Sequence, residues 1–435
     1  MASSRKLQPS LKSPKRIAVA LSGGLDSVVL LDTVCRSQDR SINPTLEIYA
    51  FHIHHGLQKP ADDWLLFCEK LAKKYQIQFD FRLLHLGDQK SGGNIEGRAR
   101  EARYEALAEL CEQYEITDLL LAHHQNDQAE TVLLQLLRGS GVAGLSGMPA
   151  TRVLKAPSKE ITLWRPLLNQ SRAELESYAK EHKLKWVEDP SNQDDVFKRN
   201  AIRKQIIPRL EKIQPEAIAN LARSASLIGE SQVLLDRLAK IDGETIYQEE
   251  AIAINPLKAL AELDLPAANN VLRYWLKTKE LSMPSQERLS AWWQDLGVVK
   301  SDAQLEWFHD GQTIRLWRSR LQVAKNQEGQ WVFKSIPSKS KEPGLSAAWI
   351  KAAQNDGLIF TKPRSGAEKL QIKANAPRRT LKNLFQESDI PPWQRNAPLL
   401  YIGQDLIAVA GVGVSYPHLV RLGPRVWPEW QQTSN

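Results

Sequence analysis

The chain of 435 residues is long enough for roughly three domains of about 150 residues each. Its 42% hydrophobic and 25% charged residues are ordinary for globular proteins, and no apolar run reaches the roughly 18 residues that a membrane span needs, which excludes a transmembrane protein. The net charge of +8 is a mild bias toward polyanionic partners. The three cysteines are too few and too widely spaced for a disulfide framework or a CxxC pair, so we expect a reducing, cytoplasmic compartment.

The first part of the chain alternates strand and helix patterns. Residues 1–16 are basic and serine-rich, and we expect a frayed tail there because no hydrophobic segment or cleavage-like site follows. Strands are predicted at 17–21, 47–53, 78–84 and 118–122, and helices at 28–34, 62–75, 96–114 and 128–138. This alternation predicts an α/β domain with a doubly wound parallel sheet, Rossmann-like, over residues 17–215.

The remaining chain predicts two further domains. Two more helices are predicted within the first domain, at 171–182, opened by a capping box of Ser171 and Glu174, and at 196–210. Beyond that domain, helices are predicted at 221–241, 269–277 and 285–295. Residues 216–333 therefore predict a mainly helical middle domain. The polar stretch 334–344 is predicted to be a linker, and short strand-like runs between glycines and prolines predict a small mixed α/β domain over 345–435.

A glycine loop joins the first predicted strand to the first predicted helix. It consists of Ser22, Gly23, Gly24, Leu25, Asp26 and Ser27. Backbone N–H groups at a helix start attract phosphate, but the lysine of a Walker A loop is missing and an acid, Asp26, stands in the loop. That combination indicates pyrophosphate held through Mg²⁺, and the alternative is an ordinary strand-to-helix turn.

Two other patterns are weaker candidates for nucleotide or metal sites. Gly139 to Gly144 matches GxGxxG, but it follows a helix and not a strand, so a dinucleotide site is not expected. His52, His54 and His55 close the second predicted strand without carboxylate or cysteine neighbours. They favour the rim of a nucleotide pocket over a zinc site.

The segment after the fourth predicted strand carries His124, Asp127 and Glu130. Ligands of such sheets bind beyond the carboxyl ends of the strands, so this segment is expected to face the glycine loop. Asp127 and Glu130, three residues apart at a helix start, suit a metal ion or an ammonium group. The alternative is simple N-capping by Asp127 with His124 as a merely polar residue.

Two basic helical segments are candidates for phosphate binding. One contains Arg100 and Arg103, and the other contains Arg199 and Arg203. Solvated helix faces have the same composition, so the residues alone leave both interpretations open.

Together these motifs resemble a known family. The glycine loop resembles the PP-loop of the N-type ATP pyrophosphatases, which cleave ATP between its α and β phosphates. In order and spacing, nearly the whole chain resembles the tRNA(Ile)-lysidine synthetase family, most weakly over residues 216–344. The motifs that carry this resemblance are 54–57, 99–104, 123–131, 137–141, 165–167, 188–192 and 199–203, and, near the end, 381–385, 390–393, 398–400 and 409–411. Asn126 departs from the family, which often has a second aspartate there.

The resemblance implies a reaction in which lysine, ATP and the wobble cytidine of an isoleucine tRNA give lysidine, AMP and pyrophosphate. It implies catalytic roles for Asp26, His124, Asp127 and Glu130, with Asp26 as the Mg²⁺ ligand, and ATP binding by the glycine loop and His54. It also implies substrate binding by Arg100, Arg103, Asp127, Glu130, Asp189 and Asn192, and tRNA binding by Arg199 and Arg203. The middle domain is expected to bind tRNA as well. The oligomeric state stays open, with a homodimer as one option.

The far end of the chain is basic. Residues 344–435 hold eleven Lys or Arg against six Asp or Glu. The resemblance to the family's C-terminal domain implies that this part grips tRNA, with Arg378, Arg379 and Lys382 on phosphates.

Two alternative functions are compatible with the same loop. A tRNA thiolation enzyme would share it, but sulfur transfer needs reactive or clustered cysteines, and Cys35, Cys68 and Cys111 lie in separate apolar helices. A non-catalytic RNA-binding module on the same fold is the other alternative. The intact Asp26 and the pair of Asp127 and Glu130 argue against it.

Overall fold

A computed structural model describes most of the chain. The described residues are 15–37, 46–54, 61–84, 95–156, 158–188, 198–299, 305–324, 329–337, 339–388, 390–396 and 398–432. They form two compact units, Met1–Arg237 and Leu238–Asn435, and the division falls inside one long helix, α9 (Ala217–Asp242). No helix in the described ranges is long and apolar enough to cross a membrane.

The first unit is built on a six-stranded sheet in the order β3-β2-β1-β4-β6-β5. Its strands are β1 (Lys15–Ala20), β2 (Leu46–His54), β3 (Gln78–Leu83), β4 (Asp118–Leu120), β5 (Thr151–Lys155) and β6 (Glu160–Trp164). All neighbours pair in parallel except β5, which runs antiparallel to β6 at the edge. The predicted parallel sheet is confirmed, and the β5–β6 hairpin is an addition that the sequence analysis did not predict. β1 also begins at Lys15, inside the predicted tail, because Lys15 and Arg16 pair with the start of β2. The Arg16 guanidinium donates a hydrogen bond to the Glu47 carboxylate there at 2.9 Å.

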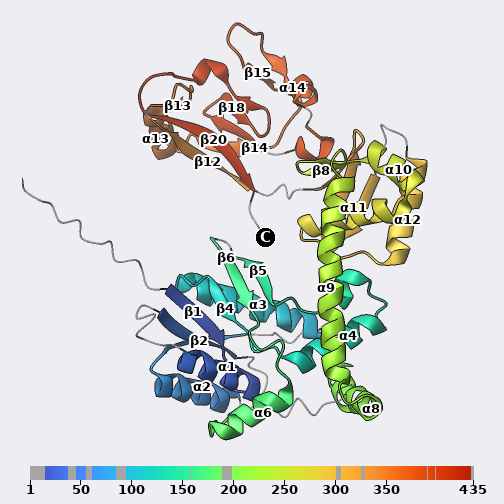
Figure 1. The fold of residues 1–435 in the computed structure, drawn as a ribbon. Helices are drawn as coiled ribbons and strands as arrows, with labels where there is room; N and C mark the ends of the chain where they lie inside the picture. The colour runs from blue at the N-terminus through green and yellow to red at the C-terminus, as the bar shows by residue number, and fades with distance from the viewer. Residues whose placement is uncertain are drawn as a thin grey trace, which may run out of the picture. The chain divides into compact units, whose positions relative to one another are not determined.

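Helices cover both faces of this sheet (Figure 1). On one face lie α1 (Leu25–Ser37), α2 (Ala61–Tyr75) and α6 (Arg172–Glu181), and on the other face lies α3 (Ile95–Gln113). α4 (Gln125–Leu137) follows β4, and the short α5 (Val142–Leu145) packs beside α4. Side chains alternate along β1, so Val19 packs with α1, α2 and α6 while Ala18 packs with α3 on the other face. The two cores fix the carboxyl edge of the sheet, where the loops after β1, β4 and β6 begin.

A helical run connects this sheet to the second unit. It consists of α7 (Lys198–Ala201), a π-helical turn (Ile202–Ile206), α8 (Ile207–Ile213) and α9. A π-turn widens the helix locally and is frequent at functional sites. It lies within the segment that carries Arg199 and Arg203.

The middle of the chain contains the predicted helices. It also contains a sheet, which the sequence analysis did not predict. Its helices are α10 (Ile254–Leu263), α11 (Leu265–Thr278) and α12 (Gln286–Val298), and its strands are β7 (Tyr247–Gln248), β8 (Ala251–Ala253), β9 (Leu305–His309), β10 (Gln312–Trp317) and β11 (Arg320–Val323). The strands pair antiparallel in the order β7-β8-β11-β10-β9. Asp310-Gly311 is a two-residue hairpin signal that the sequence analysis missed, and both residues have positive φ angles.

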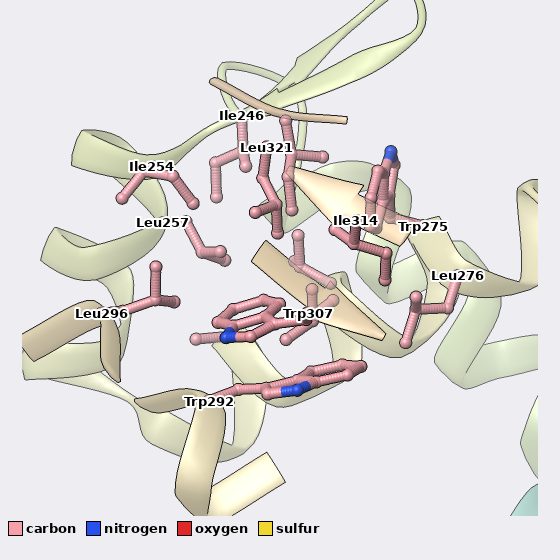
Figure 2. Packing of buried hydrophobic residues seen from close by; sticks show 14 of the residues in the cluster. Ile246, Ile254, Leu257, Trp275, Leu276, Trp292, Leu296, Trp307, Ile314 and Leu321 are labelled. Atoms are coloured by element: carbon pink, nitrogen blue, oxygen red, sulfur yellow. The ribbon is translucent and has the colours of Figure 1, made fainter. Parts of the chain in front are cut away.

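Helices and sheet of the middle region share one core (Figure 2). At its centre the indole of Trp292 from α12 stacks on that of Trp307 from β9, with ring centroids 4.6 Å apart and planes 8° apart. Trp307 also donates a hydrogen bond to Asp295 at 2.9 Å. The stack joins a helix to a strand, so it holds the two kinds of element together.

The end of the chain is a β-rich body, as predicted. Its elements are β12 (Gly329–Ile336), β13 (Leu345–Ser346), α13 (Ala347–Asn355), β14 (Ile359–Lys362), β15 (Lys369–Leu370), β16 (Arg379–Thr380), α14 (Leu381–Glu387), β17 (Leu399–Ile402), β18 (Asp405–Val409), β19 (Gly413–Val414) and β20 (Arg425–Gln432). β12 pairs along its whole length with β20. The predicted linker is therefore wrong at its start, because residues 334–336 are part of β12.

We expect Trp292→Ala to destabilise the middle region by about 3–5 kcal/mol, because it removes a buried aromatic ring and leaves a cavity under Trp307. Hydrogen–deuterium exchange of α11 and α12 peptides measures this loss locally. Val298→Ala, at a position on the same helix that is 83% exposed, is the matched control and should change protection little. Equal protection in both variants would contradict the central role of the stack.

Candidate active site

The glycine loop after β1 is held in shape by its own side chains. Ser27 accepts a hydrogen bond from the Gly23 N–H at 3.1 Å and donates one to the Gly24 carbonyl at 2.9 Å. Gly23 has a φ of +88°, and a Cβ there would lie 3.0 Å from Val187 Cγ2 and 3.2 Å from Cys68 Sγ. Glycine is therefore required by conformation and by space, and the loop leads into the N-terminus of α1, where the helix dipole favours an anion.

His124 and Asp127 form the start of α4. The His124 ring accepts a hydrogen bond from the Asn126 N–H at 3.2 Å, and the Asp127 carboxylate accepts one from the His124 N–H at 3.1 Å. The N-cap is thus His124, with Asp127 as its partner in a capping box, and not Asp127 as the alternative in the sequence analysis had it. His124 Nε2 also lies 3.6 Å from a carboxylate oxygen of Asp127 and 3.6 Å from one of Asp26. The loops after β1 and β4 therefore meet, as the sequence analysis expected.

These contacts change the pKa values of His124 and Asp127. Burial disfavours the charged form of His124, but Asp26 and Asp127 outweigh it and raise the pKa of the imidazole. Burial likewise opposes ionisation of Asp127, but His124, Arg199 and His123 outweigh it and lower its pKa. The two acids thus favour the protonated form of His124, and the ring favours the ionised form of Asp127.

Arg172, the first residue of α6, closes the site from a third side. Its guanidinium donates from one nitrogen to both oxygens of Asp26, at 2.7 and 2.9 Å. Its backbone N–H donates to the Asn126 side-chain oxygen at 3.0 Å, which gives Asn126 a structural role between α4 and α6. The sequence analysis did not propose Arg172. The sequence feature that could have pointed to Arg172 is its place directly after the N-cap Ser171, at the start of the helix that follows β6.

Glu130 lies one turn further along α4 and is 1% exposed. Both of its oxygens accept hydrogen bonds, from Arg199 at 2.6 Å and from Arg203 at 2.6 and 3.0 Å. Arg199 also contacts Asp127 at 3.1 Å. The predicted carboxylates and the second basic segment are therefore brought together, but the negative charge of Glu130 is already offset by two guanidiniums.

The first basic segment lies on α3 beside Tyr104. The Arg100 guanidinium donates to the Tyr104 hydroxyl at 3.3 Å, and Arg103 lies over the same ring at 5.9 Å. A third arginine that the sequence analysis did not propose, Arg165, follows β6 and contacts the His123 ring at 3.3 Å. Burial, together with Arg165, Arg100 and Arg199, lowers the pKa of His123 to about 3, with only Asp127 opposing.

The other predicted residues are distributed as follows. His54 is buried at the end of β2 and contacts Asp62 of α2 at 3.1 Å. Asp189 and Asn192 lie outside the described residues. In the second unit Arg378 and Lys382 are exposed, whereas Arg379 pairs with Glu387 at 2.6 Å. Within the described ranges, no group of three or more His, Cys, Asp or Glu side chains could hold a metal ion by itself.

A parallel sheet with a glycine loop after β1 and acids after β4 defines a nucleotide-binding PP-loop domain. Residues 2–210 match the family model described as the PP-loop domain. Residues 256–322 match the TilS substrate binding domain, and residues 359–422 match the TilS substrate C-terminal domain.

Relatives match along nearly the whole chain. The tRNA(Ile)-lysidine synthase of Nitrosomonas europaea is 36% identical over 94% of this chain and 90% of its own length. That of Salmonella typhimurium is 37% identical over 94% of this chain and 95% of its own length. The chain belongs to the tRNA(Ile)-lysidine synthase family. Among solved structures, the U34-tRNA thiolase NcsA from Methanococcus maripaludis aligns with a TM-score of 0.43 and 20% identity, over 51% of this chain and 74% of that one.

We expect the His124 contacts to stabilise α4 more at low pH than at high pH. A raised pKa means that the stabilisation is complete below the unfolded value of about 6.5 and is lost as the pH rises through the folded value. His124→Asn keeps an N-cap but loses the charge, so it should lower hydrogen-exchange protection of α4 about fivefold at pH 6 and much less at pH 9. His182→Asn, outside this acid cluster, is the control. An equal loss at both pH values would contradict the ionic role.

Proposed function

We propose that this protein joins free lysine to the wobble cytidine of an isoleucine tRNA with a CAU anticodon, and that it converts ATP to AMP and pyrophosphate in doing so. The observation that carries the proposal is the meeting of the glycine loop, Asp26 and Asp127 at one sheet edge in a chain that is 36% identical to a lysidine synthase over 94% of its length. The protein is a ligase of the PP-loop class and acts on tRNA. Its free cysteines suit a cytoplasmic compartment.

The reaction needs two displacements. The cytosine carbonyl oxygen is a poor leaving group, so it first attacks the α-phosphorus of ATP, and the bond from that phosphorus to the bridging oxygen of pyrophosphate breaks. The lysine ε-amine then forms the new carbon–nitrogen bond while the carbon–oxygen bond breaks and AMP leaves. The amine must lose a proton before or during this attack.

The glycine loop and Asp26 suit the first displacement. Mg²⁺ takes few protein ligands and usually binds through one or two carboxylates plus substrate phosphates, and the single accessible carboxylate of Asp26 at the loop fits that pattern. When bound, Mg²⁺ would neutralise charge on the leaving pyrophosphate. Arg172 donates to both oxygens of Asp26, so a Mg²⁺ ion held by this carboxylate would replace at least one of these contacts.

His124 and Asp127 suit the second displacement. Both oxygens of Glu130 are held at 2.6 Å by Arg199 and Arg203, whereas Asp127 meets the same arginines at the longer distances of 3.1 and 3.8 Å. Asp127 is therefore the acid whose contacts a lysine ammonium exchanges more easily. Glu130 acts through the arginines and is a positioning residue in this proposal.

The Nδ1 atom of His124 accepts the Asn126 N–H, so its Nε2 atom, 3.6 Å from Asp26 and from Asp127, carries the proton and orients both acids. His124 is therefore a positioning residue in this proposal, and the carboxylate of Asp127 is the group placed to hold the amine and its proton.

A thiolation reaction fits the cysteines poorly. Burial, with a smaller effect of Asp32, raises the pKa of Cys35 to about 11, and burial raises the pKa of Cys68 and Cys111 to about 12. The thiolate is the reactive form, so all three would be almost entirely protonated near neutral pH.

We expect Asp26→Asn to reduce formation of AMP and pyrophosphate by about 10²-fold or more, because the developing charge on the leaving group loses its metal-linked acid. Thin-layer chromatography of products from ATP labelled at the α-phosphate measures this. Asp63→Asn, an exposed acid at the start of α2, should retain activity. Release of ADP and phosphate by the wild-type protein would contradict the proposed cleavage of ATP to AMP and pyrophosphate.

We expect Asp127→Asn to weaken lysine binding by about tenfold, since a desolvated ammonium needs an opposite charge. Titration calorimetry with lysine and with norleucine, which lacks the ammonium, measures the selection. The wild-type protein should strongly prefer lysine, and the variant should lose most of this preference. Equal binding of the two amino acids by the wild type would refute carboxylate selection.

The tRNA contacts of the C-terminal body are best tested by point substitutions. A truncation after Lys341 would leave β12 without its partner β20. We expect the double substitution Arg378→Gln and Lys382→Gln to weaken tRNA binding, because two exposed charges are lost. The slope of log affinity against log salt should become less steep by about 1.5–2. Arg379→Gln is the matched control, since Glu387 already offsets its charge. Filter binding at several salt concentrations measures the slope. An unchanged slope in the double variant would show that Arg378 and Lys382 do not contact tRNA phosphates.

A further inference from the structure

Helix α6 contacts helix α1 through two polar pairs that have the same spacing along both helices. The Arg172 guanidinium donates to both oxygens of Asp26 at 2.7 and 2.9 Å, and the Tyr178 hydroxyl donates to Asp32 at 2.8 Å. The two acids are six residues apart on α1, and their two donors are six residues apart on α6. Six residues rise about 9 Å in a helix, so α1 and α6 run parallel and both begin at the candidate active site.

The pair farther from the site is a buried anchor. Asp32 is 0% exposed, and it accepts hydrogen bonds from Arg36 at 2.6 Å and from the hydroxyls of Tyr75 and Tyr178. Burial opposes ionisation of Asp32, but these three donors outweigh it and lower its pKa. Leu175 lies between the two polar contacts on α6 and is fully buried in the core that α6 shares with α1. The anchor and this core together fix the position of α6 along α1.

The pair at the site, Arg172 and Asp26, is open to solvent. Their side chains are 41% and 28% exposed. The guanidinium uses Nη1 for Asp26 and Nε for Glu176 at 3.1 Å, and within the described ranges no hydrogen bond joins its Nη2 to another residue. A partly exposed ion pair is weak, so its partners can be exchanged for those of a substrate. The anchor can therefore hold α6 in place while the guanidinium changes its partner.

The position of Arg172 beside the glycine loop limits the new partner that it can reach. Asp26 belongs to this loop, which leads into the N-terminus of α1 and favours phosphate. Once Asp26 holds Mg²⁺, Arg172 is left as an uncompensated guanidinium beside the loop. Guanidinium pairs well with phosphate oxygens, and it stabilises negative charge that develops on a phosphate leaving group. After such an exchange each charge is balanced again, because the acid faces the cation and the arginine faces the anion.

We infer that Arg172 is a further catalytic residue, which exchanges Asp26 for the leaving pyrophosphate, and that Asp32 and Tyr178 are positioning residues, which keep it beside the glycine loop. This inference rests on the proposed function for the cleavage of ATP to AMP and pyrophosphate. Glu176 holds the Nε atom of the guanidinium, which leaves Nη1 and Nη2 for the phosphate oxygens.

Binding of pyrophosphate tests the catalytic role directly, by calorimetry in the presence of Mg²⁺ with pyrophosphate and with AMP. We expect Arg172→Gln to weaken pyrophosphate binding about tenfold and AMP binding by less than about twofold, because only pyrophosphate loses a charged partner. Arg172→Lys should recover part of the loss, since it keeps the charge but not the planar fork. Lys180→Gln, at an exposed lysine of the same helix, is the matched control. Equal pyrophosphate binding by the wild type and Arg172→Gln would overturn the catalytic role.

Mg²⁺ alone tests the exchange at Asp26 without any reaction. Arg172 competes with the ion for this carboxylate, so Mg²⁺ should raise the melting temperature of Arg172→Gln more than that of the wild type, at equal ionic strength. Substitution of both residues, Arg172→Gln with Asp26→Asn, should remove this gain. Equal stabilisation of the wild type and Arg172→Gln by Mg²⁺ would refute the exchange.

Two tyrosines allow a matched test of the anchor. Tyr178→Phe and Tyr75→Phe each remove one hydroxyl from Asp32, but only Tyr178 lies on α6. We expect Tyr178→Phe to lower kcat for AMP formation about fivefold, with KM for ATP nearly unchanged, because the guanidinium is held less well where the charge develops. Tyr75→Phe should keep kcat within about twofold of the wild type. Equal losses in the two variants would refute the positioning role of Tyr178.

The outcomes separate this inference from the proposed function. If the wild type binds no pyrophosphate or releases ADP, the proposed cleavage of ATP fails, and the role of Arg172 fails with it. If the wild type forms AMP and pyrophosphate, and Arg172→Gln cleaves ATP and binds pyrophosphate equally well, the proposed function stands and the inference alone is wrong.

Discussion

The site depends on the pairing of β1 with β4. Ile17 pairs with Asp118 and Val19 with Leu120, so two strands that are distant in sequence run side by side in parallel. Parallel strands end at the same edge, and the loops that follow them are forced together. The register places His124 within 3.6 Å of Asp26 and makes one site from a glycine loop and a helix cap.

Charge is distributed unevenly along this edge. The acids after β1 and β4 are matched with guanidiniums from α6 and from the α7 segment, so little of their negative charge is uncompensated. A cationic substrate would therefore have to exchange places with an arginine. On the β6 side, no carboxylate of the described residues lies within 4.0 Å of Arg100, Arg103 or Arg165.

In the second unit, an unpaired exposed arginine and an arginine paired with an acid differ in the charge that they can offer to a phosphate. In the C-terminal body Arg378 and Arg379 are adjacent in sequence, but only Arg379 has an acid, Glu387, in contact. Adjacent residues of equal charge thus differ in the free charge that they offer to a phosphate. In the middle region the tryptophan stack fastens α12 to β9 and keeps helices and sheet in one core.

The sequence alone determined the doubly wound sheet, the glycine loop and the acids after β4, because each depends on local chemistry: strand and helix periodicity, a required glycine, and acids at a helix start. It missed the sheet of the middle region, although Asp310-Gly311 marked a hairpin, since short strands have weak patterns and pair with partners far along the chain. Only the tertiary structure decided which charges meet. Arg172 reaches Asp26, and Arg203 reaches Glu130, across long stretches of sequence, and no local spacing encodes an ion pair that strand register and helix packing create.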